Sequence, residues 1–275
     1  MAIRPPCDGG KGIGDETVHI LLRLPRPVEL VEDDAVLNEQ HPLRVAGGLD
    51  RVGHHEDGLA KGVYLVKETT VPDGYSASSQ SFLVAILDDN QVVNAYPKNQ
   101  KMEIDKNILT DEQYTAAQTA PTADQGADSV NLSVGDTVNY QIQSQVPNYD
   151  NRVIDQMDNK TVDIVEITDT LSSGLTFSAA NLEAMKVFAG DTDITSSVTK
   201  TRTDDQHFTV TVSLDDVYST EAPTKNYLGR NLYVVYQATV NDNAVVSTGN
   251  KNEASLKYKN SPDDSQYDPT PVDIP

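Results

Sequence analysis

The sequence predicts an all-β protein in which an immunoglobulin-like β-sandwich is preceded by the partial end of another β domain. Two observations support this prediction. After about residue 58, Ser, Thr, Tyr and Asn become frequent, which is typical of short strands joined by turns. Over residues 99–262, segments of strand length recur between turn signals, which is the pattern of a sandwich.

The amino-terminal stretch differs in composition from the rest of the chain. Residues 1–58 contain no Ser, Tyr or Phe, but they hold the single cysteine, Cys7, and four of the five histidines. We interpret residues 1–58 as an atypical leader that is disordered or foreign to the rest of the chain. The alternative is a poorly ordered amino-terminal region that belongs to the same protein.

Residues 59–98 have the pattern of the last strands of a domain. The segment GVYLVKETT alternates between two faces, VPDGY reads as a turn, and SFLVAIL and QVVNAY come next as further strands. The earlier strands of this domain are not recognisable. At the other end of the chain, residues 263–275 have the Pro and Asp content of a linker towards a further domain.

Composition and charge exclude several classes of function. A net charge of −21 and a pI near 4.4 argue against nucleic acid or an anionic membrane as a partner. No apolar run is long enough to span a membrane, and no export signal or anchor is recognisable, so an exported protein would be represented by a fragment. His207 is the only histidine after residue 58, and HHED at residues 54–57 lacks zinc-site spacing, so we expect no catalytic triad, metal or cofactor.

Two lysines lie close together in VVNAYPKNQKMEIDKN, which runs from Val92 to Asn107. Lys98 follows a Tyr-Pro pair at the end of a strand-like run. Lys106 shares one face of the next strand with Ile104 and Ile108, so a half-buried strand would point it inward. Because burial of an ammonium is costly, we expect the pKa of Lys106 to fall and the neutral amine to become accessible.

The same counting predicts a buried carboxyl and a buried carboxamide. Asp169 is in phase with Ile167 in EITDTL, and Asn252 is in phase with Ala254 and Leu256 in the last strand of the sandwich. A buried amine, a buried carboxyl and a buried carboxamide are each costly alone. Together they predict a reaction.

Three neighbouring residues are alternatives to this trio. Lys101 is separated from Lys106 by an odd number of residues, so it would face the opposite side of the strand. Glu166 is likewise out of phase with Ile167 and is expected to be solvated. Asn250 is in phase with Asn252 but lies in the STGNKN turn, so Asn252 is preferred.

Six segments, in this order, resemble motifs of shaft pilins, the backbone subunits that sortases join covalently into pili on Gram-positive bacteria. YLVKETTVPDGY is similar to the pilin E-box, and VVNAYPK is similar to the pilin motif, although Asp89 and Ala95 replace its tryptophan and its second valine. SVGDTVNYQI with ITDTLSSGLTF, VVYQATVND, and NEASLKY resemble a Cna-like, D2-type domain that forms an internal Lys-Asn isopeptide bond. The resemblance covers about residues 59–260.

The resemblance implies roles for five residues. Neutral Lys106 would attack the side-chain carbonyl of Asn252, while protonated Asp169 polarises that carbonyl and shuttles protons. Lys98 would be the acceptor amine through which a sortase joins one subunit to the next. Glu68 would be the E-box glutamate that catalyses an equivalent bond in the first domain, but no lysine partner is found upstream and no bond is expected there.

The function implied by the resemblance is that of a structural pilus subunit on the cell surface or cell wall. Its expected partners are a pilin-class sortase and neighbouring pilin subunits, with a host surface ligand as a further possibility. It would not be an enzyme, because the isopeptide reaction is intramolecular and occurs once. The alternative is an adhesin or pilus tip module that uses the same sandwich to bind host protein or glycan.

Overall fold

The computed structural model describes residues 99–262 with gaps at 124, 150–153, 156, 158–159, 223 and 246–248, together with several short segments outside that range. These segments are residues 16–22, 32–37, 43–45, 62–70, 74–77, 82–87, 93–95 and 268–269. The chain divides into two compact units: residues 1–73 with 80–97, and residues 74–79 with 98–275.

The first unit contains two small antiparallel sheets. A four-stranded sheet has the order β2-β1-β4-β6, and β3 pairs with β7 in a second sheet. The strands are β1 (Glu16–Leu22), β2 (Glu32–Leu37), β3 (Leu43–Val45), β4 (Gly62–Thr70), β6 (Phe82–Ile86) and β7 (Val93–Ala95). Strands β1 to β3 lie within the stretch interpreted as a leader, and β1 pairs along β4. The foreign origin of residues 1–58 stays a prediction.

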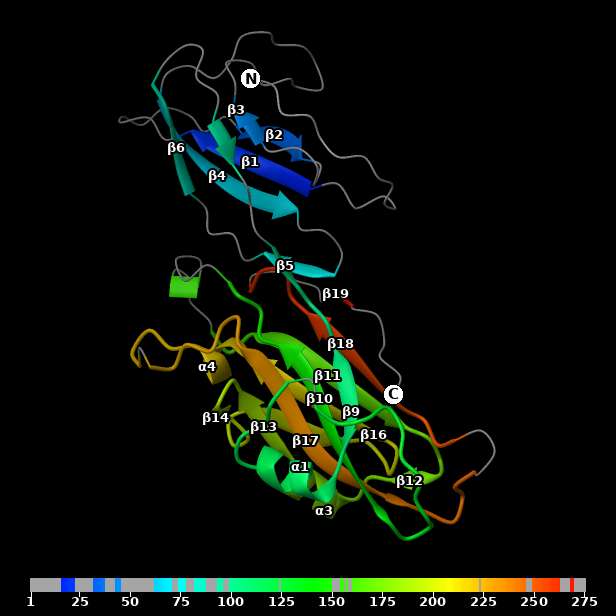
Figure 1. Ribbon diagram of the computed structural model, residues 1–275. Coiled ribbons are helices and arrows are strands. Elements are labelled where there is room, and N and C mark those ends of the chain that lie inside the picture. The colour runs from blue at the N-terminus through cyan, green and yellow to red at the C-terminus, as the bar shows by residue number, and fades with distance from the viewer. Residues whose placement is uncertain are drawn as a thin grey trace. The chain divides into compact units, whose positions relative to one another are not determined.

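The second unit is a sandwich of two antiparallel sheets, which confirms the predicted fold class (Figure 1). One sheet, here the β10 sheet, has the order β14-β13-β17-β10-β9, with β12 also paired to β17. The other, the β11 sheet, has the order β15-β16-β11-β18-β19. A separate pair joins β5 (Tyr75–Ala77) to β8 (Asn99–Lys101).

The strands of the β10 sheet are β9 (Asp105–Leu109), β10 (Thr137–Gln145), β12 (Leu175–Thr176), β13 (Lys186–Ala189), β14 (Thr192–Asp193) and β17 (Asn231–Val240). Those of the β11 sheet are β11 (Asp163–Leu171), β15 (Thr199–Arg202), β16 (His207–Ser213), β18 (Asn252–Tyr258) and β19 (Asp268–Pro269).

The sequence pattern explains which faces of the two sheets are buried. Strands β16 and β18 alternate between buried and more exposed residues, as expected for a sheet with one face on the core. Strands β10 and β17 are buried almost continuously. On the outer face, Val235 of β17 clusters with Leu109 and with Ala117 of helix α1 (Asp111–Ala117). Helix α1 therefore covers part of the outer face of the β10 sheet.

Polar side chains on the covered outer face are satisfied by hydrogen bonds. Nδ2 of Asn139 donates to Oδ1 of Asp111 over 2.8 Å, and Nε2 of Gln237 donates to Oδ1 of Asn139 over 2.7 Å. The helix begins at a capping box, in which Thr110 accepts from the backbone N–H of Gln113 and Gln113 accepts from that of Thr110. These contacts hold the covering segment against the sheet and pair the side-chain amide of Asn139 on both its nitrogen and its oxygen.

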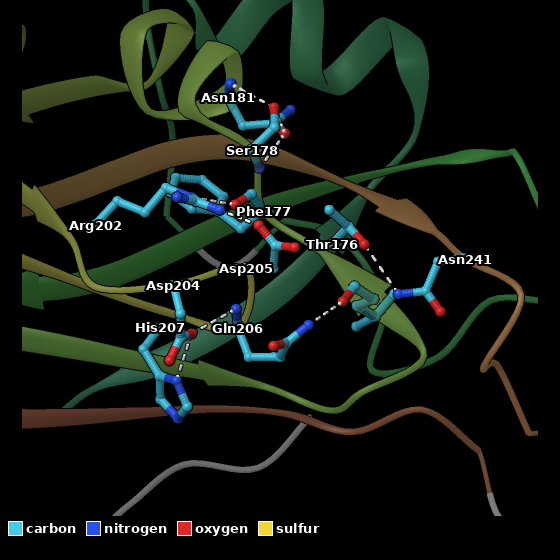
Figure 2. A network of polar contacts seen from close by, with 11 residues as sticks. Thr176, Phe177, Ser178, Asn181, Arg202, Asp204, Asp205, Gln206, His207 and Asn241 are labelled. Carbon is cyan, nitrogen blue, oxygen red and sulfur yellow. Dashed lines mark hydrogen bonds and ion pairs between the residues drawn. The ribbon is translucent and has the colours of Figure 1, made fainter.

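A second polar network fixes the segment that follows β12 (Figure 2). Nε of Arg202 donates to the carbonyl of Phe177 over 2.7 Å, and Nδ2 of Asn241 donates to Oγ1 of Thr176 over 2.9 Å. Ser178 then caps the short helix α3 (Ala179–Ala184) through Asn181. The network holds Phe177 inward, where its ring lies 4.5 Å from that of Phe208 between the sheets.

Candidate functional site

Three polar side chains lie in the otherwise apolar core between the two sheets. The exposed fractions are 1% for Lys106, 0% for Asp169 and 1% for Asn252. Lys106 is carried by β9 of the β10 sheet, while Asp169 and Asn252 are carried by β11 and β18 of the β11 sheet. The trio therefore spans the sandwich from one sheet to the other.

The period-2 geometry of the strands positions each member of the trio. Lys106 is paired in register with Ile142 of β10, whose side chain is fully buried. Asn252 is paired with Leu171, two residues beyond Asp169 on the same strand. Because residues two apart share a face, Asp169 and Asn252 both point into the core.

Hydrogen bonds connect the trio through a fourth residue, Tyr236 of β17. Nζ of Lys106 donates to Oδ2 of Asp169 over 2.5 Å, and the hydroxyl of Tyr236 donates to the same oxygen over 2.9 Å. Nδ2 of Asn252 in turn donates to the hydroxyl oxygen of Tyr236 over 2.8 Å. The amine and the carboxamide are thus joined by one chain of contacts.

Aromatic rings enclose this chain of contacts. Nζ of Lys106 lies 5.2 Å from the ring centroid of Tyr140 and 5.8 Å from that of Tyr236. The Tyr140 and Tyr236 rings are stacked at 5.2 Å, and Phe208 meets Tyr236 edge to face at 4.9 Å. Rings around an ammonium lower its electrostatic energy but supply no proton acceptor, so Asp169 is the base that contacts Lys106.

Burial changes the acidity of the carboxyl and of both tyrosines. Desolvation raises the pKa of Asp169, and the charge and hydrogen bonds of Lys106 and Tyr236 oppose that rise. Desolvation also raises the pKa values of Tyr236 and Tyr140, so both phenols stay neutral at physiological pH. Burial therefore makes the carboxyl of Asp169 easier to protonate than a solvated one.

Two acceptor oxygens in the site have no hydrogen-bond partner. They are Oδ1 of Asp169 and Oδ1 of Asn252, and both atoms are buried. A buried unsatisfied acceptor is costly, and two acceptors cannot bond to each other unless one carries a proton. A proton on the carboxyl of Asp169 would turn one of its oxygens from an acceptor into a donor.

The alternatives weighed from the sequence lie outside the core. Lys101 is exposed and pairs with Glu103, and Glu166 accepts from Lys257 over 2.9 Å near the surface. The side chain of Asn250 is bonded to the backbone of Val245 in a turn. The structure thus brings Lys106, Asp169 and Asn252 together and leaves Lys101, Glu166 and Asn250 apart from them.

The two remaining site predictions concern the region before the sandwich. Glu68 is part of β4, for which the structure describes the backbone pairing with β1. Lys98 lies outside the described residues. The predicted roles of all five residues stay predictions at this point.

Sequence reasoning missed Tyr236, although a signal was available. In NLYVVYQATV, Tyr236 is in phase with Leu232, Val234 and Ala238, which predicts an inward side chain. A buried tyrosine hydroxyl normally needs a hydrogen-bond partner, so its position could have been connected with the buried polar trio. Tyrosine is also common in strands, and the pattern alone does not separate it from ordinary core residues.

Metal sites and membrane spans are absent from the residues that the structure describes. None of their His, Cys, Asp and Glu side chains forms a group of three or more that could hold a metal ion. No helix in this part of the chain is long and apolar enough to cross a membrane.

One known protein family has a model that matches the part of the chain containing most of the site. Residues 134–262 match the family model of the Gram-positive pilin backbone subunit 2, Cna-B-like domain. The match covers just under half of the 275 residues and includes Asp169, Tyr236 and Asn252, whereas Lys106 precedes it. It supports a backbone pilin domain. No curated protein matches the chain.

Solved structures similar to this chain include three pilins. The T6 backbone pilin of serotype M6 Streptococcus pyogenes has 17% identity and a TM-score of 0.44 over 79% of this chain and 45% of that one. BcpA, the major pilin subunit of Bacillus cereus, has 14% identity and a TM-score of 0.48 over 94% of this chain and 63% of that one. The full-length pilus protein RrgB from Streptococcus pneumoniae has 16% identity and a TM-score of 0.48 over 97% of this chain and 44% of that one. The chain thus spans between 44% and 63% of the length of these three proteins.

Proposed function

We propose that the chain is a structural subunit of a covalently polymerised pilus on the surface of a Gram-positive bacterium. We further propose that Lys106 and Asn252 form an isopeptide bond by an autocatalytic reaction that needs Asp169. The observation that carries this proposal is the buried chain of contacts from Lys106 through Asp169 and Tyr236 to Asn252. Asp169, Tyr236 and Asn252 lie in the range that is similar to a pilin backbone domain.

The reaction begins with a proton transfer inside the buried pair. Nζ of Lys106 already donates to Oδ2 of Asp169, and the raised pKa of Asp169 makes it easier for the carboxyl to take that proton. The transfer leaves a neutral amine, which is the nucleophilic form of lysine. Neutralisation also removes two charges from an apolar core, where their desolvation is costly.

The neutral amine then attacks the side-chain carbonyl carbon of Asn252. The carbonyl oxygen, Oδ1, becomes negative in the tetrahedral intermediate, and the protonated carboxyl of Asp169 is the acid available to stabilise it. Ammonia leaves and an amide remains. The sandwich supplies the high effective concentration of amine and carbonyl, because the two groups are fixed between opposing sheets.

The product would tie the two sheets together covalently. Lys106 lies on β9, at one edge of the β10 sheet, and Asn252 lies on β18 in the β11 sheet. Strand β9 is also the first strand of the sandwich in the sequence, and β18 is its last long strand. A pull on the two ends of the domain would therefore be borne by a covalent bond, as a pilus shaft requires.

The intact mass of the purified chain tests the isopeptide reaction. We expect a mass one ammonia molecule below that of the sequence. The Lys106→Ala variant should have the full mass of its own sequence, because the attacking amine is absent. As a matched control, Lys101→Ala should lose ammonia as the wild type does, since Lys101 is exposed. A wild-type chain with its full sequence mass would reject the proposed bond.

Sortase-dependent joining is proposed to use Lys98 as the acceptor amine. In the full-length protein, Lys98→Ala should abolish the ladder of covalent polymers on denaturing gels, while Lys101→Ala should leave it intact. The reason is that Lys98 follows Tyr-Pro in a pilin-like motif, whereas Lys101 does not. An unchanged ladder in the Lys98→Ala strain would instead favour the adhesin or tip module.

A further inference from the structure

The hydroxyl of Tyr236 lies between the carboxyl and the carboxamide of the site. It donates to Oδ2 of Asp169 over 2.9 Å and accepts from Nδ2 of Asn252 over 2.8 Å. Its side chain is fully buried, with an exposed fraction of 0%. The nitrogen that it contacts is the atom that leaves as ammonia in the proposed reaction.

We propose that Tyr236 is a catalytic residue of this reaction, whose hydroxyl passes a proton from Asp169 to Nδ2 of Asn252 as ammonia departs. The inference rests on the proposed function, because it concerns the same isopeptide bond. It adds the leaving-group step, in which an amide nitrogen must gain a proton before it can be expelled.

The proton and electron balance closes with these groups alone. Attack forms the Nζ–Cγ bond, and the carbonyl electron pair moves to Oδ1. Asp169 then gives its proton to the Tyr236 oxygen while Tyr236 gives its own to Nδ2, so the carboxyl becomes a carboxylate. The carboxylate takes a proton from Nζ, the electron pair on Oδ1 restores the carbonyl, and the Cγ–Nδ2 bond breaks. One amine and one primary amide become one secondary amide and ammonia, and Asp169 regains its proton.

The change in the nitrogen during attack explains why the relay runs in this direction. In the unreacted carboxamide, the nitrogen lone pair is delocalised and Nδ2 can only donate, as it does to Tyr236. In the tetrahedral intermediate the nitrogen is no longer conjugated, so it has a free lone pair that can accept. The hydroxyl then turns its hydrogen from Asp169 towards Nδ2.

The contacts of Asp169 favour a relay over direct transfer. Its Oδ2 atom accepts hydrogen bonds from both Lys106 and Tyr236. The same oxygen can therefore take a proton from the attacking amine and give a proton to the Tyr236 hydroxyl. The contact of Nδ2 is with the hydroxyl rather than with the carboxyl. Burial raises the pKa of Tyr236, so the phenol stays protonated and transfers protons in a concerted exchange.

The aromatic shell makes a conservative test possible. The Tyr236 ring is stacked on Tyr140 and meets Phe208 and Phe177 at its edges. Tyr236→Phe keeps these ring contacts and removes only the hydroxyl. Tyr218→Phe is the matched control, because it also removes a hydroxyl that donates to a carboxylate, that of Asp155 over 2.9 Å, away from the trio.

The experiment follows the intact mass of the full chain with time after cell-free synthesis is stopped. We expect Tyr236→Phe to lose ammonia at least about 100-fold more slowly than the wild type, as for removal of a general acid. Tyr218→Phe should react at the wild-type rate. Loss of ammonia from Tyr236→Phe at the wild-type rate would overturn the relay alone, whereas a wild-type chain that keeps its full mass would overturn the isopeptide bond as well.

A second measurement covers the case in which Tyr236→Phe does not fold. The wild-type reaction is followed in heavy water, where the concerted exchange of two protons predicts slower loss of ammonia than in ordinary water. An unchanged rate in heavy water would overturn the relay. Folding of Tyr236→Phe is checked by comparing the unfolding midpoint of Asn252→Ala with that of the double variant Asn252→Ala with Tyr236→Phe. Neither of these two proteins can form the bond, so their midpoints can be compared directly.

Discussion

Replacement of Asn252 by alanine is expected to lower the midpoint of thermal unfolding by about 10–20 °C. The proposed bond between Lys106 and Asn252 closes a loop of about 150 residues, and the chain-entropy model then gives a stabilisation of about 5 kcal/mol. In a domain of this size, each kcal/mol corresponds to about 2–4 °C. The hydrogen bond that Asn252 donates to Tyr236 adds only about 1 kcal/mol to the loss.

Calorimetry of the wild type, Asn252→Ala and Asn250→Ala measures this effect. Asn250 lies two residues away in a turn and contacts only backbone groups of Val245 in its side-chain hydrogen bonds, so its replacement should change the midpoint little. Lys106→Met removes the same crosslink from its other end. The double variant should therefore lose the crosslink contribution once, and a fully additive loss would contradict a covalent bond between these two residues.

The inward orientation of the trio could be predicted from the sequence because strands have a strict period of two. Ile104 and Ile108 flank Lys106, Ile167 precedes Asp169 by two residues, and apolar residues follow Asn252 in phase. A strand with one face on a core must bury every residue that shares that phase. The sequence therefore indicated which side of each strand these residues occupy, without any knowledge of their partners.

The partners of these residues could not be predicted in the same way. Which strands lie opposite one another depends on packing across the core between segments far apart in the chain, such as β9 and β11. Tyr236 was missed for this reason: its hydroxyl has a role only beside Asp169 and Asn252, which come from other strands. The local pattern of β17 marks it only as a buried aromatic residue.

Local signals were also overlooked where the composition was polar. Residues 110–128 are rich in Ala, Thr, Gln and Asp and have no strand pattern, yet helix α1 begins there at a capping box formed by Thr110 and Gln113. The seven-residue helix is too short to be stable by propensity alone. Its stability comes from contacts with the β10 sheet, through Ala117 and the hydrogen bond from Asn139 to Asp111.

The position of the trio separates two contributions to the stability of the sandwich. A covalent bond acts mainly on the unfolded chain by restricting its conformations, whereas the pair of Lys106 and Asp169 acts on the folded state by neutralising a buried charge. Loss of Asn252 removes the first contribution and leaves the pair in place. Loss of Asp169 removes both.

Replacement of Asp169 by alanine in the Asn252→Ala background is expected to lower the free energy of unfolding by a further ~3–5 kcal/mol. The bond is already absent from this background, so the loss measures the buried pair alone. Lys106 is left in the core without the carboxylate that neutralises it, and a buried ammonium lacking its counter-charge is strongly destabilising. In the otherwise wild-type chain, Asp169→Ala should also prevent the loss of ammonia.

Denaturant unfolding of matched variants measures the cost of this unpaired lysine. Asp193→Ala in the same background removes the carboxylate of a half-exposed pair with Lys186 and should change stability by about 1 kcal/mol or less. Changing both members of the buried pair, as in Lys106→Met with Asp169→Leu, should recover most of the loss, because apolar residues of similar volume can replace a buried ion pair. If Asp169→Ala lowers the free energy of unfolding no more than Asp193→Ala does, Lys106 and Asp169 are not charged in the protein that lacks the bond. The proton transfer that starts the proposed reaction would then have no charged pair to begin from.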